Sequence, residues 1–336
     1  MTMQRKSILT NWLSQCYPDQ PFTLSFAAAD ADFRRYFRAT FEDNTTVICM
    51  DAPPDKMSIE SYIKVQKLFQ SINVPEIYHA DAQLGLMALQ DFGHTSYLAA
   101  LEHDQRLEVQ KILLLEAIDE LLQLQLSSQA GQLPEYDESV LIREMQLFPD
   151  WFVAKELKQN FNFKQQQLWQ QTITTLLPIL TSQPKVYVHR DFIVRNLMLT
   201  PSRPGVLDFQ DALYGPITYD LISLLRDAFI EWEVEFVLDL AIRYWEKART
   251  AGLPVCSEFD TFYRDFEWMG VQRHLKVAGI FARLYYRDGK DKYRSEIPRF
   301  LTYLRKTSRR YQALQPLYQL LTELSDHEEI QTGYTF

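Results

Sequence analysis

The pattern of apolar residues changes near residue 92, and few folds accommodate such a change. Before this point, short segments are rich in β-branched and aromatic residues, whereas beyond it apolar residues recur three and four positions apart over long stretches. The first pattern is typical of strands and the second of amphipathic helices. We therefore expect an α+β fold, with a small β-rich lobe over residues 1–91 and a large, mainly helical lobe over residues 92–336.

The individual elements follow from the same local patterns. The amino terminus predicts a surface helix, and strands are predicted over residues 23–26, 36–41, 45–50 and 85–90, with one helix over residues 58–71 among them. Residues 42–44 are polar and short enough to close a hairpin between the second and third strands. Later helices are predicted over residues 105–126, 138–148, 164–180, 234–248, 259–286 and 298–324, the last with breaks. Only one later stretch departs from the helical pattern.

That stretch, residues 185–209, contains short β-type segments at residues 186–188, 197–199 and 206–207. His189, Arg190 and Asp191 follow the first segment, and Asn196 lies five positions beyond Asp191. We expect His189 to support the loop. The turn at residues 201–205 contains proline and glycine and should fold the chain back, so that Asp208 lies beside Asn196. The three oxygen-bearing side chains are thus expected to converge.

The spacing of this motif is typical of phosphoryl transfer. That reaction needs a carboxylate to orient and deprotonate the attacking hydroxyl, and oxygen ligands to fix Mg²⁺ on the phosphates of ATP. We expect Asp191 to be the catalytic base, and Asn196 and Asp208 to be the metal ligands. A bare His-Arg-Asp tripeptide is also compatible with an acid that caps a helix or pairs with Arg195, but the neighbouring strands and the second aspartate favour catalysis. Asp211 could add a metal or substrate contact, or be a solvated carboxylate.

Composition excludes several classes of protein. A formal net charge of -9 argues against a protein that coats nucleic acid. Cys16, Cys49 and Cys256 lie far apart, so the sequence has no disulfide framework and fits a reducing compartment. No apolar run approaches the roughly 18 residues that cross a membrane. We expect a cytoplasmic enzyme without a nucleic-acid, membrane or obligate protein partner.

The motif and four longer strings resemble those of the aminoglycoside phosphotransferase-like small-molecule kinases. The strings lie at residues 29–38, 50–56, 206–227 and 270–290, and are most similar to the bacterial anomeric kinases of N-acetylmuramate and N-acetylglucosamine. The resemblance implies the two-lobed protein-kinase-like fold. It also implies transfer of the γ-phosphoryl group of ATP, with Mg²⁺, to the C1 hydroxyl of an amino sugar in cell-wall recycling. Asp220 is implied to be a buried helix acid that braces the catalytic loop.

The sequence departs from the broader kinase pattern where phosphates usually bind. Its first glycine is Gly85, so it has neither a glycine-rich loop nor a Walker A motif in the early strands. Residues 27–32 have small side chains there, which could bring backbone N–H groups near phosphate oxygens. Met50 takes the place of the usual strand lysine. Candidates for the missing cation are Arg34, Arg35, Arg38 and Lys56, with a preference for Arg35 and Arg38.

Binding of the two substrates is expected at separate groups of residues. Leu89, Gln90 and Asp91 lie at the end of a predicted strand, at the hinge between the lobes, and should bind the adenine through exposed backbone groups. The carboxylate of N-acetylmuramate calls for an arginine, which can donate two parallel hydrogen bonds. Candidates for the sugar are Arg195, Arg226, Arg273 and His274, each of which could instead form an ordinary ion pair on a helix surface.

Two alternative functions stay open at this point. One is a kinase of another small alcohol, such as an aminoglycoside, choline or homoserine. The other is a catalytically silent, kinase-like scaffold protein, which the missing glycines and strand lysine would fit. The joint presence of Asp191, Asn196 and Asp208 favours an enzyme.

Overall fold

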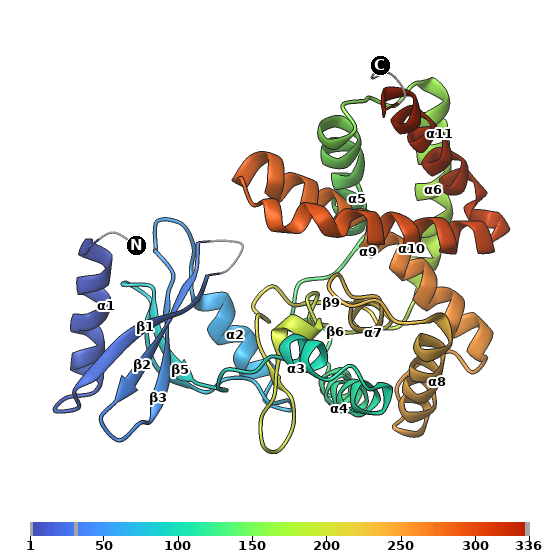
Figure 1. Ribbon diagram of the computed structural model, residues 1–336. Coiled ribbons are helices and arrows are strands. Elements are labelled where there is room, and N and C mark those ends of the chain that lie inside the picture. Colours follow the sequence, from blue (N-terminus) through green and yellow to red (C-terminus); the bar gives the residue numbers. More distant parts are fainter. Residues whose placement is uncertain (1–2, 30–32, 333–336) are drawn as a thin grey trace. The chain divides into compact units, whose positions relative to one another are not determined.

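The computed structural model describes residues 3–29 and 33–332, and the chain divides into two compact units (Figure 1). Unit 1 comprises Met1–Leu124 and Arg195–Ala212, and unit 2 comprises Gln125–Val194 and Leu213–Phe336. These units differ from the lobes expected on either side of residue 91, because residues beyond 91 also pack with the β-rich part. The lobe boundary stays a prediction. Of the segment at residues 27–32, positions 30–32 lie outside the described residues.

Unit 1 contains a five-stranded antiparallel sheet with the strand order β1-β2-β3-β5-β4. Its strands are β1 (Phe22–Ala29), β2 (Arg35–Phe41), β3 (Thr46–Asp51), β4 (Ile77–Asp81) and β5 (Leu86–Gln90). The four predicted strands and the hairpin between β2 and β3 are confirmed. The prediction missed β4, an edge strand of only five residues in which none is fully buried, so its sequence lacks the apolar alternation of a half-buried strand.

Helices cover this sheet from two sides. Helix α1 (Met3–Cys16) packs on one face through Leu9, Trp12 and Leu13, which contact a cluster that includes Ala39, Phe41, Val47, Cys49, Leu86 and Ala88. These six residues come from alternate positions of β2, β3 and β5, and alternate residues of a strand point to one face. Helix α2 (Glu60–Leu68) lies on the other side (Figure 1). Ser58 Oγ accepts a hydrogen bond from the Glu60 N–H at 3.1 Å, close to the predicted cap.

The rest of unit 1 holds the hairpin that follows the catalytic motif. Its elements are α3 (Tyr97–His103), α4 (Leu107–Leu126), β7 (Leu197–Met198) and β8 (Gly205–Val206). Leu197 pairs with Val206 as predicted. The Val206 N–H donates to the Asn73 carbonyl at 2.7 Å. A Cβ on Gly205 would lie 2.5 Å from Cδ2 of Phe92, so the ring packs where only glycine fits. These contacts fix the hairpin within unit 1.

Unit 2 is mainly helical. Its helical segments are α5 (Glu138–Met145), the π-helix η1 (Phe148–Glu156), α6 (Phe163–Ser182), α7 (Tyr219–Leu225), α8 (Val234–Thr250), α9 (Phe259–Asp288), the 3-10 segment η3 (Asp291–Glu296), α10 (Ile297–Arg310), the 3-10 turn η4 (Gln312–Leu314) and α11 (Gln315–Thr332). Its small sheet pairs β6 (Lys185–Val188) with β9 (Leu213–Pro216). The long predicted helices are confirmed, but the one expected over residues 138–148 ends at Met145. The prediction missed α7 and β9, which have only 7 and 4 residues and therefore little periodicity.

Helix α9 is the longest helix described and is buried on every side over much of its length. It has 30 residues, and positions 266–279 are all buried. A helix enclosed in this way belongs to the core of its unit. A Cβ on Gly279 would lie 2.3 Å from the carbonyl carbon of Leu147, and one on Gly270 would lie 3.1 Å from Cγ1 of Ile222. Glycine therefore lets α9 approach the backbone at the start of η1, and a second glycine lets it pack, less closely, on α7.

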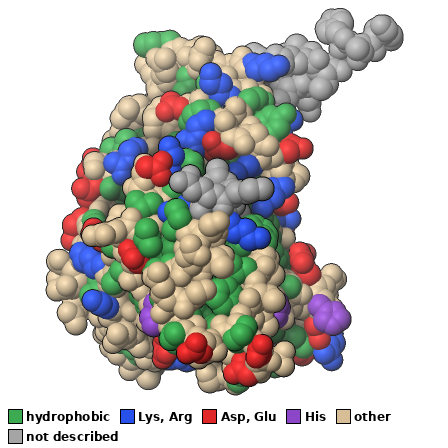
Figure 2. Space-filling model, turned by 90° about the vertical axis from the view of Figure 1, so that its left-hand side faces the viewer, with side chains coloured by type: hydrophobic (Ala, Val, Ile, Leu, Met, Phe, Trp, Pro, Cys, Tyr) green, Lys and Arg blue, Asp and Glu red, His purple; other side chains and the backbone are tan. Residues whose placement is uncertain are grey.

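The charged side chains are mixed on the face that Figure 2 presents. There, the lysine and arginine side chains of the described residues are interspersed with aspartate and glutamate side chains. None of the described helices combines the length and the apolar character that a membrane span requires.

Candidate active site

The His-Arg-Asp motif forms a loop at the end of strand β6 in unit 2. His189 is fully buried, and its Nδ1 accepts a hydrogen bond from the Asp191 N–H at 3.3 Å. This is the supporting contact expected of His189. Arg190 has φ of 76°, in the left-handed region that side chains other than glycine rarely adopt. The loop therefore needs contacts from elsewhere to hold that conformation.

Asp220 supplies these contacts from helix α7. Its Oδ2 accepts a hydrogen bond from the His189 N–H at 2.6 Å, and its Oδ1 accepts one from the Arg190 N–H at 2.9 Å. Burial raises the pKa of Asp220 to about 7, although the two N–H groups act in the opposite direction. The two hydrogen bonds offset a backbone strain of about 1–3 kcal/mol. The bracing role that the resemblance implies for Asp220 is confirmed.

Asp191 lies among positively charged side chains. Burial favours its neutral form, but the charges of Lys276, Arg273 and Arg190 outweigh this effect and lower the pKa of the Asp191 carboxyl. Two of these cations come from α9 and the third from the loop itself. Asp191 is therefore an ionised carboxylate at neutral pH, which is the form that a catalytic base needs.

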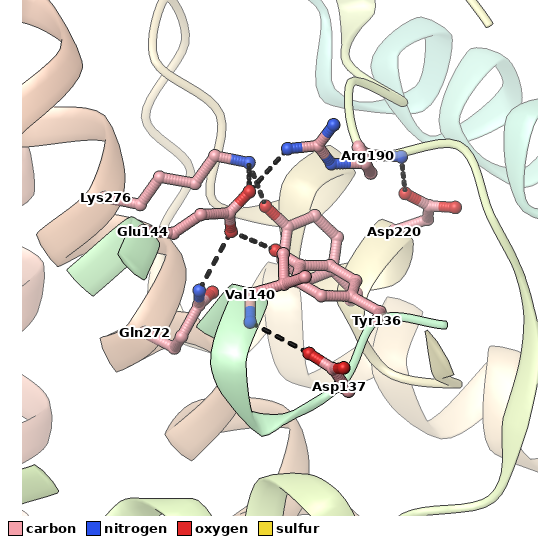
Figure 3. A network of polar contacts seen from close by, with 9 residues as sticks. Tyr136, Asp137, Val140, Glu144, Arg190, Asp220, Gln272 and Lys276 are labelled. Carbon is pink, nitrogen blue, oxygen red and sulfur yellow. Dashed lines mark hydrogen bonds and ion pairs between the residues drawn. The ribbon is translucent and has the colours of Figure 1, made fainter. Parts of the chain in front are cut away.

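A buried polar network around Glu144 lies beside this loop (Figure 3). Oε1 of Glu144 accepts a hydrogen bond from Nη2 of Arg190 at 2.5 Å and lies 3.1 Å from Nζ of Lys276. Oε2 accepts a hydrogen bond from Nε2 of Gln272 at 3.1 Å and another from the hydroxyl of Tyr136. Figure 3 shows these four side chains pointing at the one carboxylate. Glu144 thus joins α5 and α9 to the catalytic loop.

The negative charge of the Glu144 carboxylate is balanced by the positive charges beside it. Burial acts to raise the pKa of Glu144, but Lys276, Arg190 and the Tyr136 hydroxyl together lower it to about 2. Sequence reasoning missed this residue because no motif contains it. A signal was present, since Glu144 lies three residues after Leu141 on the buried side of α5. An acid on the apolar side of a short helix indicates a buried partner.

Unit 1 holds the two predicted metal ligands. Asn196 ends the 3-10 turn η2 (Val194–Asn196), and its carbonyl accepts a hydrogen bond from the Leu207 N–H at 2.9 Å. The hairpin therefore places Asp208 one residue from this contact. An amide oxygen and a carboxylate are ligands that Mg²⁺ prefers, so the donor set fits that ion. Among the described residues, no group of three or more histidines, cysteines, aspartates or glutamates could hold a metal. Kinases share their Mg²⁺ ions with substrate phosphates and do not need such a cluster.

Arg34 lies against Asp208. Its Nη2 is 3.3 Å from Oδ1 of Asp208, which also accepts a hydrogen bond from Nε2 of Gln210 at 2.9 Å. Arg34 is only 5% exposed, and Asp208 has φ of 66°. Arg34, one of the four candidate cations, therefore lies beside a predicted metal ligand.

Arg35 and Arg38, the two preferred candidates, each form an ion pair with a buried carboxylate. Nη2 of Arg35 lies 2.6 Å from Oδ2 of Asp51. Arg38 donates through Nε to Oδ2 of Asp91 at 2.5 Å and through Nη2 to Oδ1 at 3.0 Å. These ion pairs hold Arg35 and Arg38 within the sheet, and which of the candidate cations binds phosphate stays a prediction. Lys56 is exposed.

The predicted adenine-binding residues lie at the end of β5. Leu89 is buried in the sheet, and the Gln90 N–H donates to the Glu76 carbonyl at 2.9 Å. Burial acts to raise the pKa of Asp91, but its hydrogen bonds, the strongest from Arg38, lower it below its usual value. The Asp91 side chain is therefore structural. Contacts of these three residues with adenine stay a prediction.

The predicted substrate-binding residues lie in three places. Arg195 and Asp211 belong to unit 1. Arg273 belongs to unit 2, where its charge lowers the pKa of Asp191. Arg226 and His274 line a cavity in unit 2 that neither Asp191 nor Arg273 lines. Of the unit 2 candidates, Arg273 thus acts on the predicted base, and sugar contacts of Arg226 and His274 stay a prediction.

Comparisons with known proteins give a family and a close relative. The model of the phosphotransferase enzyme family matches residues 23–253. The N-acetylmuramate/N-acetylglucosamine kinase of Neisseria meningitidis serogroup B is 70% identical to this chain over 334 residues, which cover 99% of this chain and 100% of that protein.

Two solved structures share the fold. Choline kinase from Cryptosporidium parvum Iowa II has a TM-score of 0.63 at 12% identity, over 94% of this chain and 99% of that one. The ADP-bound aminoglycoside phosphotransferase APH(2'')-Ib has a TM-score of 0.56 at 13% identity, over 88% of this chain and 97% of that one. At these identities the likeness concerns the fold alone, and it confirms the predicted protein-kinase-like class.

Proposed function

The chain belongs to the phosphotransferase enzyme family, and we propose that it uses ATP to phosphorylate the anomeric C1 hydroxyl of N-acetylmuramate and N-acetylglucosamine. The substrate class rests on one observation, the similarity of the whole chain to the Neisseria kinase named for these two sugars. The position of transfer rests on the resemblance of the motifs to anomeric kinases. The braced loop that carries Asp191 supports the reaction class.

Asp191 acts as the base in this proposal. The C1 hydroxyl loses its proton to the Asp191 carboxylate while its oxygen forms a bond to the γ-phosphorus. The bond from that phosphorus to the β-phosphate oxygen breaks, and ADP leaves. The cations around Asp191 make it a weak base, but an anomeric hydroxyl is more acidic than an ordinary alcohol. Asp220 contributes by fixing the loop.

Asn196 and Asp208 are proposed to hold Mg²⁺, which supplies positive charge to the phosphate oxygens when bound. Arg34 is proposed as the cation that replaces the strand lysine, because its guanidinium lies beside Asp208. A planar guanidinium can donate two parallel hydrogen bonds to a phosphate. These roles assign both metal ligands and the phosphate-binding cation to unit 1.

The remaining roles follow the chemistry of the two substrates. Leu89, Gln90 and Asp91 are proposed to bind adenine through backbone groups. Arg273 is proposed to bind the carboxylate of N-acetylmuramate, because it lies close to Asp191. Substrate contacts from Arg195 and Asp211, the cytoplasmic location and the role in cell-wall recycling stay predictions.

A panel of acceptors tests this function. The protein is incubated with ATP and Mg²⁺ and, separately, with N-acetylmuramate, N-acetylglucosamine, an aminoglycoside or choline. Phosphorus NMR should show a new phosphate signal coupled to the anomeric proton of each amino sugar. A phosphate on the aminoglycoside or on choline alone would replace the proposed substrate class. Nucleotide binding without any product would favour the scaffold interpretation.

A further inference from the structure

A cavity of about 220 Å³ lies in unit 2, where α7, α9 and α10 meet. Arg226 follows α7, His274 comes from α9, and Tyr303 from α10, and all three are buried. Lys306 and Arg309 also line the cavity from α10 and are exposed, so they form its rim. The proposed function uses neither the cavity nor these residues.

Helix α7 separates the cavity from the catalytic loop. Asp220 bonds the loop, whereas Ile222, two residues further along, lines the cavity. Two residues correspond to about 200° around a helix, so these side chains leave α7 on nearly opposite sides. On α9 the same division holds, because Lys276 contacts Glu144 while His274 lines the cavity. The cavity is therefore a separate site.

The floor of the cavity has polar groups without partners. Arg226 is only 9% exposed, and its guanidinium lies 5.3 Å from the centroid of the Tyr303 ring. Among the residues that the structure describes, no carboxylate forms an ion pair with Arg226. His274 is 2% exposed, and neither of its ring nitrogens has a hydrogen-bond partner among these residues. A buried cation without a counter-charge is unfavourable, so these groups indicate that a ligand completes the site.

Charge identifies the kind of ligand. Four cations line the cavity, namely Arg226, Lys306, Arg309 and Arg310, together with the carboxylate of Glu267. That carboxylate is already engaged, because Oε1 accepts a hydrogen bond from Nη1 of Arg310 at 2.7 Å and Oε2 accepts one from the Tyr311 hydroxyl at 2.7 Å. Just outside the lining, Oε1 of Glu231 lies 3.6 Å from Nζ of Lys306. Arg310 and Lys306 are thus each paired with a carboxylate, and the excess positive charge of the cavity comes from Arg226 and Arg309, in a chain whose formal net charge is -9. Such a site attracts a compact anion that carries more than one negative charge.

We propose that this cavity binds a phosphate group, with Arg226 and His274 as its ligands at the floor. The phosphate can come from the free inorganic anion or from a small phosphorylated sugar, since the volume equals that of about seven water molecules. Binding is expected to be independent of the nucleotide site, because no predicted nucleotide-binding or metal-binding residue lines the cavity.

Thermal unfolding of the full chain tests the site. Inorganic phosphate is titrated at constant ionic strength, with ADP and Mg²⁺ present to fill the nucleotide site. The wild type should show a saturable rise in Tm of about 2 °C or more at a tenfold excess over Kd. Arg226→Gln should abolish this rise. Arg243→Gln is the matched control, because Arg243 is an exposed arginine on α8 that pairs with Asp239 at 3.0 Å and does not line the cavity.

A second variant keeps the test decisive if Arg226→Gln does not fold. Arg309→Gln changes an exposed rim residue and should lower the phosphate affinity by up to about fivefold, without altering the Tm measured in the absence of phosphate. Titration with glucose 1-phosphate distinguishes the sources: tighter binding than that of inorganic phosphate assigns the site to a phosphorylated sugar, and weaker binding assigns it to the free anion. No saturable response to either ligand, or an equal response in Arg226→Gln, would overturn the site.

Discussion

At the scale of single residues, two buried acids hold the catalytic loop in different ways. Glu144 binds the Arg190 guanidinium, and Asp220 binds the Arg190 backbone N–H. Cations bring the pKa of Glu144 down to about 2, whereas burial brings that of Asp220 up to about 7. The position of Asp191 therefore depends on Arg190, the residue before it, and on two acids far from it in sequence.

Replacement of Glu144 by glutamine should destabilise the protein by about 3–5 kcal/mol, because Lys276 and Arg190 would lose their buried counter-charge. The folded pKa of about 2 lies below the ordinary value of 4.5. The wild type should therefore lose this stabilisation as the pH falls from about 4.5 towards 2, and the variant should lack that pH-dependent component. Urea unfolding at several pH values measures both effects.

The matched control is Glu138→Gln, an exposed change on the same helix, which should cost less than about 1 kcal/mol. Equal stabilities of the two variants at neutral pH would show that the network around Glu144 does not stabilise the fold.

Replacement of Arg273 by methionine should separate the two proposed sugars. An arginine–carboxylate hydrogen bond contributes about 1.5–3 kcal/mol, so KM for N-acetylmuramate should rise by roughly tenfold to a hundredfold. N-acetylglucosamine has no carboxylate and serves as the internal control, because any general damage to the loop affects both sugars. Steady-state kinetics with each sugar measures the ratio of the two KM values. An unchanged ratio would remove Arg273 from carboxylate recognition.

Site residues that lie close together along the chain could be predicted from the sequence. Site residues that only long-range packing brings together could not. The loop from His189 to Asn196 and the hairpin to Asp208 depend on local turns. Glu144, in contrast, reaches Arg190 across 46 residues of sequence, and no spacing rule connects them. Arg34 could be named as a candidate, but only its ion pair with Asp208 distinguishes it from its neighbours.

At the scale of elements, helix α9 positions much of unit 2. It carries Lys276 and Arg273 towards the catalytic loop and packs closely on α7. Apolar residues recur at helical spacing over a long stretch, so the sequence predicted α9, as it predicted the other long helices. Short elements such as α7 and β9 escaped prediction, since tertiary contacts and not their own pattern stabilise them.

Gly279→Ala tests the close packing of α9. The new Cβ would lie 2.3 Å from the Leu147 carbonyl carbon, which is backbone and cannot rotate away. Overpacking of this kind costs about 1–3 kcal/mol, whereas alanine gains about 1 kcal/mol over glycine from helix propensity alone. We expect a net loss of stability in urea unfolding. A gain of about 1 kcal/mol would mean that the helix is not held against Leu147.

At the scale of the whole molecule, the two compact units do not follow the order of the chain. Arg195–Ala212 belongs to unit 1, while the segments on either side of it belong to unit 2. Asp191 is therefore part of one unit, and its predicted metal-binding partners are part of the other. The change of pattern near residue 92 predicts the two kinds of structure, but long-range packing decides which segment joins which unit.

Turnover of Asp191→Asn is the most direct measurement of the proposed reaction. Isothermal titration should show that the variant still binds ATP, since the residues proposed for the nucleotide are unchanged. Transfer of phosphate to N-acetylglucosamine should fall by about a hundredfold to ten-thousandfold, the usual contribution of a positioned base, and the acidity of the anomeric hydroxyl places the loss towards the lower end. A variant that transfers phosphate at the wild-type rate would show that Asp191 is not the base.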